Sequence, residues 1–266
     1  MAVFLINDKQ VHSYEQLLAE INGSQSYYPL YKQPDLFLYF SNLIKALSSN
    51  VPLILLDADL NANEIGGVDE SRMNVAETLP VKGEITIEEV IAAVQNSSSQ
   101  ITIFTSGTTG QPKKVVHNVQ NLTRSVRQGE KYNGQIWAYA YNPTHMAGLQ
   151  VFFQTFMNQN TLVNVFNKSR SEVYELIECQ KVTHISATPT FYRLLLPFEK
   201  EYPLVQRVTL GGEKSDSKLY DNITKIFPSA KINNVYASTE AGSLFAAKGD
   251  AFQLPEKLRN KFKIVD

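Results

Sequence analysis

Short apolar runs that alternate with stretches of helical periodicity are the feature that most restricts the fold of this chain. Several of the runs are apolar at consecutive positions, as expected for strands buried on both faces of a parallel sheet. Strands and helices in alternation indicate parallel sheets with crossover connections. The sequence therefore predicts the α/β class, with layered parallel or mixed sheets flanked by helices. We expect strands at VPLILLD (51–57), ITIFTS (101–106), IWAYAYN (136–142), TLVNVF (161–166), VTHISA (182–187), RVTLGG (207–212) and INNVYA (232–237).

Helices are expected around and between these runs. Ser13 is a suitable N-cap for the first of them, and Val173, Leu176 and Ile177 form one apolar stripe on a later one. The expected helices are SYEQLLAEI (13–21), the segment 35–47, SRSEVYELIECQ (169–180) and PTFYRLLLPF (189–198), the last with proline at its start.

Two polar segments divide the pattern. The segment 61–84 contains Gly66, Gly67 and Pro80, and 96–100 has the sequence NSSSQ, so both are typical of surface linkers. We place a boundary near residue 98, which predicts an N-terminal α/β subdomain at 1–98 and a second α/β subdomain at 99–266.

Composition excludes several classes of protein. With 266 residues and 43% hydrophobic content, the chain can bury a core without covalent staples. The net charge of −1 gives no field for nucleic acid or an anionic membrane, so we expect neither partner. A single cysteine, Cys179, excludes an internal disulfide framework and suits the cytoplasm, and the N-terminus is too briefly apolar for a signal peptide or membrane span.

The stretch TSGTTGQPKKV (105–115) directly follows an expected strand and precedes a helix expected to start near His117 or Asn118. Ligands bind at the carboxyl ends of strands in open α/β sheets. Two glycines let backbone N–H groups approach phosphate oxygens, while hydroxyls and Lys113 add donors and charge. A polar surface turn is the alternative for this stretch. A Walker A loop is excluded by spacing. That motif has a glycine, four further residues and then Gly-Lys-Ser/Thr, whereas here two residues separate Gly107 from Gly110 and Lys113 is followed by Lys114.

A second motif, NVYASTEAG (234–242), also lies at the end of an expected strand. Glu240 is a candidate ligand for Mg²⁺, which prefers oxygen ligands and often shares them with substrate phosphates. Tyr236 offers a ring for stacking on a purine, and Asn234 offers a donor and an acceptor for a base edge. A strand followed by a helix cap is the structural alternative.

Together the two motifs, with GGE (211–213) between them, resemble the adenylate-forming superfamily of acyl-CoA synthetases, adenylation domains and luciferases. This resemblance implies the layered α/β fold of their large N-terminal domain, and it makes 99–266 the nucleotide-binding subdomain. It also implies a ligase that uses ATP and Mg²⁺ to convert a carboxylic acid into an acyl-adenylate. The thiol of CoA or of a carrier protein's phosphopantetheine then accepts the acyl group. Weaker matches extend it over nearly the whole chain at 12–21, 51–60, 142–149 and 182–196.

The resemblance also assigns roles. The phosphate loop that holds the β- and γ-phosphates comprises Thr105, Ser106, Gly107, Thr108, Thr109, Gly110 and Lys113. The residues along the adenine are Gly211, Gly212, Glu213, Asn234, which meets the exocyclic amine, and Tyr236, which stacks on the ring. Thr239 contacts the α-phosphate and Glu240 holds Mg²⁺. His145, in NPTHMAGL, lies at the mouth of the acid pocket near the thiol tunnel. The expected catalytic residues are thus Thr239, Glu240, Lys113 and His145, whereas His12, His117 and His184 are expected to be structural.

The sequence departs from the family pattern in three places. Lys114 and Ala237 each replace a usual glycine, and the downstream Tyr-x-Thr-Gly-Asp motif, the hinge and the small C-terminal domain with its catalytic lysine have no match. A shortened form of a two-domain enzyme and a natural single-domain relative both explain the last departure. We therefore expect weak adenylation by this chain alone. A nucleotide-binding module without turnover and a phosphotransferase are the competing functions. The acid is expected to be an aryl acid or a short to medium acyl chain.

Overall fold

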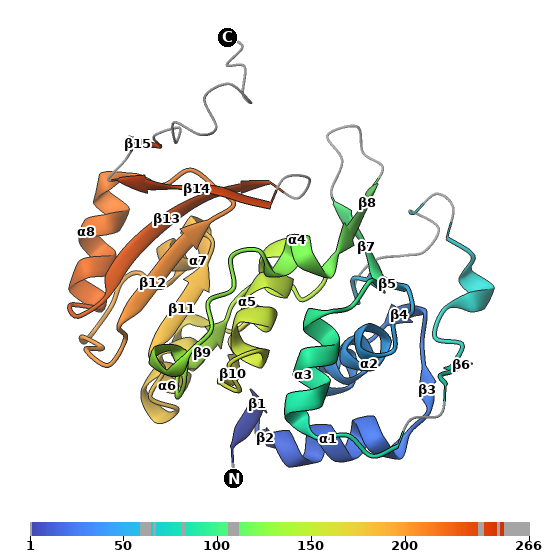
Figure 1. Ribbon diagram of the computed structural model, residues 1–266. Coiled ribbons are helices and arrows are strands. Elements are labelled where there is room, and N and C mark those ends of the chain that lie inside the picture. Colours follow the sequence, from blue (N-terminus) through green and yellow to red (C-terminus); the bar gives the residue numbers. More distant parts are fainter. Residues whose placement is uncertain are drawn as a thin grey trace.

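The computed structural model of the chain describes residues 2–58, 65, 68–80, 83–105, 112–238, 242–248 and 251–252, with side chains as far as residue 235. Its α/β architecture confirms the predicted fold class (Figure 1). The helices are α1 (Tyr14–Gly23), α2 (Leu36–Ser48), α3 (Ile87–Gln95), α4 (Val119–Thr123), α5 (Met146–Phe156), α6 (Arg170–Cys179), α7 (Pro189–Leu194) and α8 (Ser217–Ile226), with 3-10 turns at Glu70–Arg72 and Glu130–Tyr132.

The strands of the described residues form three sheets. The largest has nine strands in the order β15-β14-β13-β12-β11-β9-β10-β1-β2, the second has the order β4-β5-β7-β8, and β3 pairs with β6. Their bounds are β1 (Val3–Asn7), β2 (Gln10–Ser13), β3 (Ser26–Tyr27), β4 (Leu30–Lys32), β5 (Leu53–Leu56), β6 (Glu77–Thr78), β7 (Gln100–Thr105), β8 (Lys113–Asn118), β9 (Ile136–Tyr139), β10 (Thr161–Asn164), β11 (His184–Ala187), β12 (Arg207–Gly211), β13 (Lys231–Ser238), β14 (Gly242–Lys248) and β15 (Ala251–Phe252).

Period-two side-chain alternation places helices on both faces of the large sheet. On β9, Tyr139 packs into a core shared with α1, α2, α3 and α5, whereas Ala138 packs into a core shared with α6, α7 and α8. Leu162 and Val163 divide in the same way on β10. The layers are therefore α6–α8, the nine-stranded sheet, α1–α5 and the four-stranded sheet, as Figure 1 shows.

Local capping explains where the predicted helices begin. The hydroxyl of Ser13 accepts the backbone N–H of Gln16 at 3.1 Å, and the Gln16 side chain returns a bond to Ser13, which is a complete capping box. Asp35 caps α2 with a single bond, since its side chain accepts the backbone N–H of Leu38 at 2.9 Å. All seven expected strands are present, with bounds that differ by a few residues.

The helix expected near His117 or Asn118 is present, since α4 starts at Val119 with Asn118 as its N-cap. The segment before it differs from the expectation, because residues 113–118 form strand β8, antiparallel to β7. Val115 and Val116 are β-branched and favour a strand, and β7 supplies its hydrogen-bonding partner.

The predicted division near residue 98 stays a prediction. Each main sheet takes strands from both sides of that point, because β1 pairs with β10 and β5 pairs with β7.

Among the described helices, none combines the length and the apolar composition that a bilayer crossing requires.

Candidate functional site

Four parallel strands end together at one edge of the large sheet. β9, β11, β12 and β13 are parallel neighbours, so the segments after them gather at their carboxyl ends. In the register of β12 and β13, Leu210 is opposite Asn234 and Gly211 is opposite Val235. The structure therefore brings Gly211 and Asn234, two of the predicted adenine residues, onto adjacent strands within one register position.

The glycine turn after β12 has a conformation that glycine favours. Gly212 has φ of +85°, in the left-handed region, where a side chain would add strain. A Cβ built on Gly211 would lie 3.5 Å from the hydroxyl of Tyr141 and 3.6 Å from the carbonyl oxygen of Val235. Those are ordinary contact distances, so backbone conformation at Gly212 constrains this turn more than space at Gly211.

Tyr141 packs against this turn. Its side chain is buried, and burial raises the pKa of Tyr141 above its usual value. Ser186 on β11 acts on the hydroxyl to lower this pKa, and the charge of Glu213 adds to the rise. The hydroxyl therefore remains protonated at neutral pH and can donate a hydrogen bond.

Asn234 has one end of its amide without a partner. The side chain is buried, and Nδ2 donates to the Ser215 hydroxyl at 2.8 Å. Oδ1 accepts no hydrogen bond from any described residue. A buried acceptor without a donor costs about 1–3 kcal/mol. A ligand that carries an N–H group removes this cost, so the residue fits an adenine amine.

Glu213, which was predicted to lie along the adenine, also accepts hydrogen bonds within the protein. Its Oε2 accepts from the backbone N–H of Thr190 at 3.0 Å and from the Thr190 hydroxyl at 2.5 Å. Thr190 lies in the first turn of α7, where a carboxylate satisfies a free N–H group and complements the helix dipole. Glu213 thus holds α7 against the glycine turn.

The ends of the predicted phosphate loop are held side by side. Thr105 is the last residue of β7 and Lys113 the first residue of β8, and the two are directly paired across the hairpin. The predicted ligands Ser106, Gly107, Thr108, Thr109 and Gly110 lie outside the described residues.

The second motif is described only in part. Tyr236 lies on β13 opposite Phe245 of β14, but its side chain is not described. Thr239 and Glu240, the predicted α-phosphate and Mg²⁺ residues, lie outside the described residues. Within the described ranges, no three His, Cys, Asp or Glu side chains gather as a metal site.

His145 is the N-cap residue of α5, directly after the turn that follows β9. Its backbone N–H donates to the carbonyl oxygen of Asn142 at 3.1 Å. Partial desolvation lowers the pKa of the His145 imidazole, and the negative charge of Asp57 offsets only part of this decrease. Because the net pKa is below its usual value, the neutral ring is favoured at physiological pH.

Asp57 and Asn142 were not predicted as site residues, yet they lie beside His145. Asp57 follows β5 in the small sheet, and its Oδ2 accepts a hydrogen bond from Nδ2 of Asn142, which follows β9 in the large sheet. The available signal was position, since both polar residues come directly after apolar strands.

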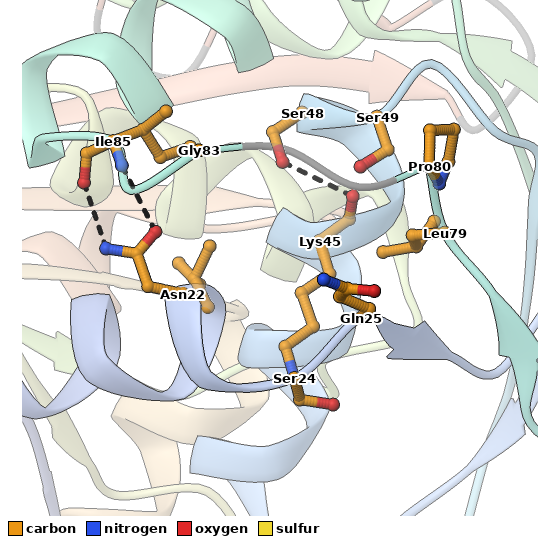
Figure 2. A pocket seen from close by; sticks show the side chains of 11 residues that line it. Asn22, Ser24, Gln25, Lys45, Ser48, Ser49, Leu79, Pro80, Gly83 and Ile85 are labelled. Atoms are coloured by element: carbon orange, nitrogen blue, oxygen red, sulfur yellow. Dashed lines mark hydrogen bonds between the residues drawn. The ribbon is translucent and has the colours of Figure 1, made fainter.

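A small cavity elsewhere in the molecule contains none of the predicted site residues. It measures about 40 Å³ and lies between the ends of α1 and α2 and the segment before α3 (Figure 2). Lys45 on its wall is paired with Glu20 at 2.7 Å, and Asn22 binds the backbone of Ile85 on another side. This volume is on the scale of one or two water molecules.

A sequence model of AMP-binding enzymes matches residues 43–262, which is most of the chain. The chain belongs to the AMP-binding enzyme family. The match includes both predicted nucleotide motifs, the strands that position Gly211 and Asn234, and the His145 turn.

Curated relatives of the family agree with this assignment. The chain is 28% identical to the 2-succinylbenzoate–CoA ligase of Bacillus pumilus over 68% of this chain and 38% of the relative. It is 30% identical to the D-alanine–D-alanyl carrier protein ligase of Lactococcus lactis over 59% of this chain and 34% of the relative. The chain thus spans little more than a third of these two proteins.

Solved structures share the fold. The N-terminal subdomain of NpsA from Klebsiella oxytoca superposes with a TM-score of 0.68 at 15% identity, covering 92% of this chain and 73% of that one. The o-succinylbenzoate CoA synthetase MenE of Bacillus subtilis, in complex with ATP and magnesium ion, superposes with a TM-score of 0.64 at 18% identity. That superposition covers 98% of this chain and 61% of MenE.

Proposed function

We propose that this chain binds ATP and carries the large-domain part of an AMP-forming acid–thiol ligase. The family match supports the reaction class, and the single observation in the structure that supports the nucleotide site is the unpartnered buried oxygen of Asn234. A carboxylate oxygen of the substrate attacks the α-phosphorus of ATP, the bond to the bridging oxygen breaks, and pyrophosphate leaves. A thiol then attacks the acyl carbon of the adenylate and AMP departs.

The residues of the chain divide the first step between them. Asn234, with the turn at Gly211 and Gly212, binds the adenine on which Tyr236 stacks, and Glu213 supports the turn through α7. The backbone and hydroxyls from Thr105 to Gly110, together with Lys113, hold the β- and γ-phosphates. This positioning matters because two anions must be brought together in the reaction.

The remaining predicted roles concern charge and substrate. Thr239 contacts the α-phosphate, and Glu240 holds Mg²⁺, which neutralises charge on the phosphates. His145, at the N-terminus of α5, lies at the mouth of the acid pocket.

We further propose an acid of the aryl or short to medium acyl class, with CoA or a carrier protein as acceptor. Relatives of both acceptor types support this range, since their names include a trans-cinnamate:CoA ligase and a D-alanyl carrier protein ligase. The cytoplasm is proposed as the compartment because the chain has a single cysteine.

A hydroxamate-trapping screen tests the reaction. The chain is incubated with MgATP, hydroxylamine and a panel of aryl and acyl acids, and AMP, ADP and pyrophosphate are quantified. We expect acid-dependent hydroxamate with AMP and pyrophosphate in equal amounts, all strongly reduced in Glu240→Ala. Release of ADP and phosphate would contradict the proposal in favour of a phosphotransferase. Binding of ATP that is indifferent to Glu240→Ala, without hydroxamate for any acid, would favour a non-catalytic nucleotide-binding module.

A further inference from the structure

The side chain of Asn142 is committed at both ends of its amide. Its Nδ2 donates to Asp57, and its Oδ1 accepts from the backbone N–H of Thr144 at 2.9 Å and from the Thr144 hydroxyl at 2.8 Å. The carbonyl oxygen of Asn142 accepts the backbone N–H of His145 at 3.1 Å. Asp57 is thus connected to His145 through one residue and a short turn.

Two other elements fix the same turn. The hydroxyl of Tyr39 on α2 donates to the carbonyl oxygen of Pro143 at 3.0 Å. Gly148 packs so closely beneath the turn that an added Cβ would lie 2.3 Å from the carbonyl oxygen of Asn142. Residues 142–145 are therefore fixed by α2, by α5 and, through Asp57, by the small sheet, so the position of His145 is set by three separate elements.

The link between Asp57 and Asn142 joins two sheets at the candidate site. β5 and β9 belong to different sheets, and the described residues connect their carboxyl ends through these two side chains. Both side chains are only half-buried, and a carboxylate acceptor makes a stronger hydrogen bond than a neutral one.

We propose that Asp57 is a positioning residue that sets the orientation of His145 by holding Asn142. This inference rests on the proposed place of His145 at the acid pocket, but the link itself does not depend on that function. The negative charge of Asp57 also raises the pKa of the His145 imidazole, which opposes the effect of desolvation.

The test is an NMR titration of the histidine ring protons in the full chain. The sequence has four histidines, so the His145 resonance is assigned by its loss in His145→Gln. Asp57→Asn keeps the size and an acceptor but removes the charge, and Asn142→Ala removes the link but keeps the charge. The double variant Asp57→Asn with Asn142→Asp exchanges donor and acceptor and rebuilds the bond. Glu178→Gln, in an exposed pair with Lys200, is the matched control for loss of a surface carboxylate.

We expect Asp57→Asn to lower the pKa of His145 further, since a nearby carboxylate favours the imidazolium. We expect Asn142→Ala to shift and broaden the His145 resonance, the double variant to restore its position, and Glu178→Gln to change neither. An unchanged His145 resonance in Asp57→Asn and Asn142→Ala would overturn the proposal. This holds even if both variants lower the melting temperature, because Asp57 would then stabilise the fold without orienting His145. No substrate is needed, so failure of the ligase function would not be confused with failure of this inference.

Discussion

Replacing Gly148 by alanine should destabilise the protein and disturb the turn that carries His145. The added Cβ would lie 2.3 Å from the carbonyl oxygen of Asn142 and 2.8 Å from the hydroxyl of Tyr139. The first of these obstacles is backbone and cannot rotate away, so the cost belongs at the upper end of the ~1–3 kcal/mol typical of overpacking. Alanine regains up to ~1 kcal/mol of helix propensity within α5. The net loss is therefore about 2 kcal/mol.

The assay is thermal unfolding with Gly23→Ala as the matched control. Gly23 is also helical, in α1, but an added Cβ there meets nothing within 4 Å. That variant should gain between zero and about 1 kcal/mol. At roughly 2–4 °C per kcal/mol for a chain of this size, Gly148→Ala should melt about 4–8 °C below the parent. If Gly148→Ala melted as high as Gly23→Ala, the packing of α5 against the Asn142 turn would be refuted.

Two further predictions concern buried polar groups. Tyr192→Phe should cost about 1–2 kcal/mol, because its hydroxyl lies 3.1 Å and 3.0 Å from two carbonyl oxygens. Tyr139→Phe should cost less than about 0.5 kcal/mol, because the Tyr139 hydroxyl has no partner among the described residues. Urea unfolding measures both variants, and equal losses of unfolding free energy would contradict this prediction. Burial lowers the pKa of His184 from 6.5 to about 4. Between these pH values the unfolded state binds a proton that the folded state does not, so the free energy of unfolding falls as the pH decreases from about 6.5 to 4. The loss reaches up to about 3 kcal/mol, and His184→Gln should flatten the dependence of the unfolding free energy on pH; an equally steep profile in that variant would exclude His184 as its source.

Local sequence signals account for most of the central fold. The runs that became β9 to β13 were all predicted as strands, and helices were expected between β10 and β11 and between β11 and β12, which favours parallel strands. Because β12 and β13 follow one another in the chain and pair in the sheet, the adjacency of Gly211 and Asn234 is consistent with that pattern. The helix α8 also has a readable signal, since Leu219, Ile223 and Ile226 repeat on one face after Asp216.

The elements that escaped prediction depend on contacts distant in sequence. β1 has five residues and is completed by β10, to which Thr161 adds a bond from its hydroxyl to the carbonyl oxygen of Val3. The helix α5 is buried on nearly all sides between the two sheets, so it lacks the polar face that marks a surface helix. The link from Asp57 to Asn142 joins two sheets, and no local pattern predicts which strand ends meet across layers.

The central claim is that the carboxyl edge of the large sheet binds adenine through Asn234. The most direct measurement is calorimetric titration of the chain with MgATP and with MgITP, in which an oxygen replaces the exocyclic amine. The unpartnered Oδ1 of Asn234 can accept from the amine but is repelled by the oxygen, so the parent should bind ATP about tenfold more tightly, and Asn234→Ala should lose this preference. Equal affinity of the parent for the two nucleotides, or a preference that persists in Asn234→Ala, would contradict the account.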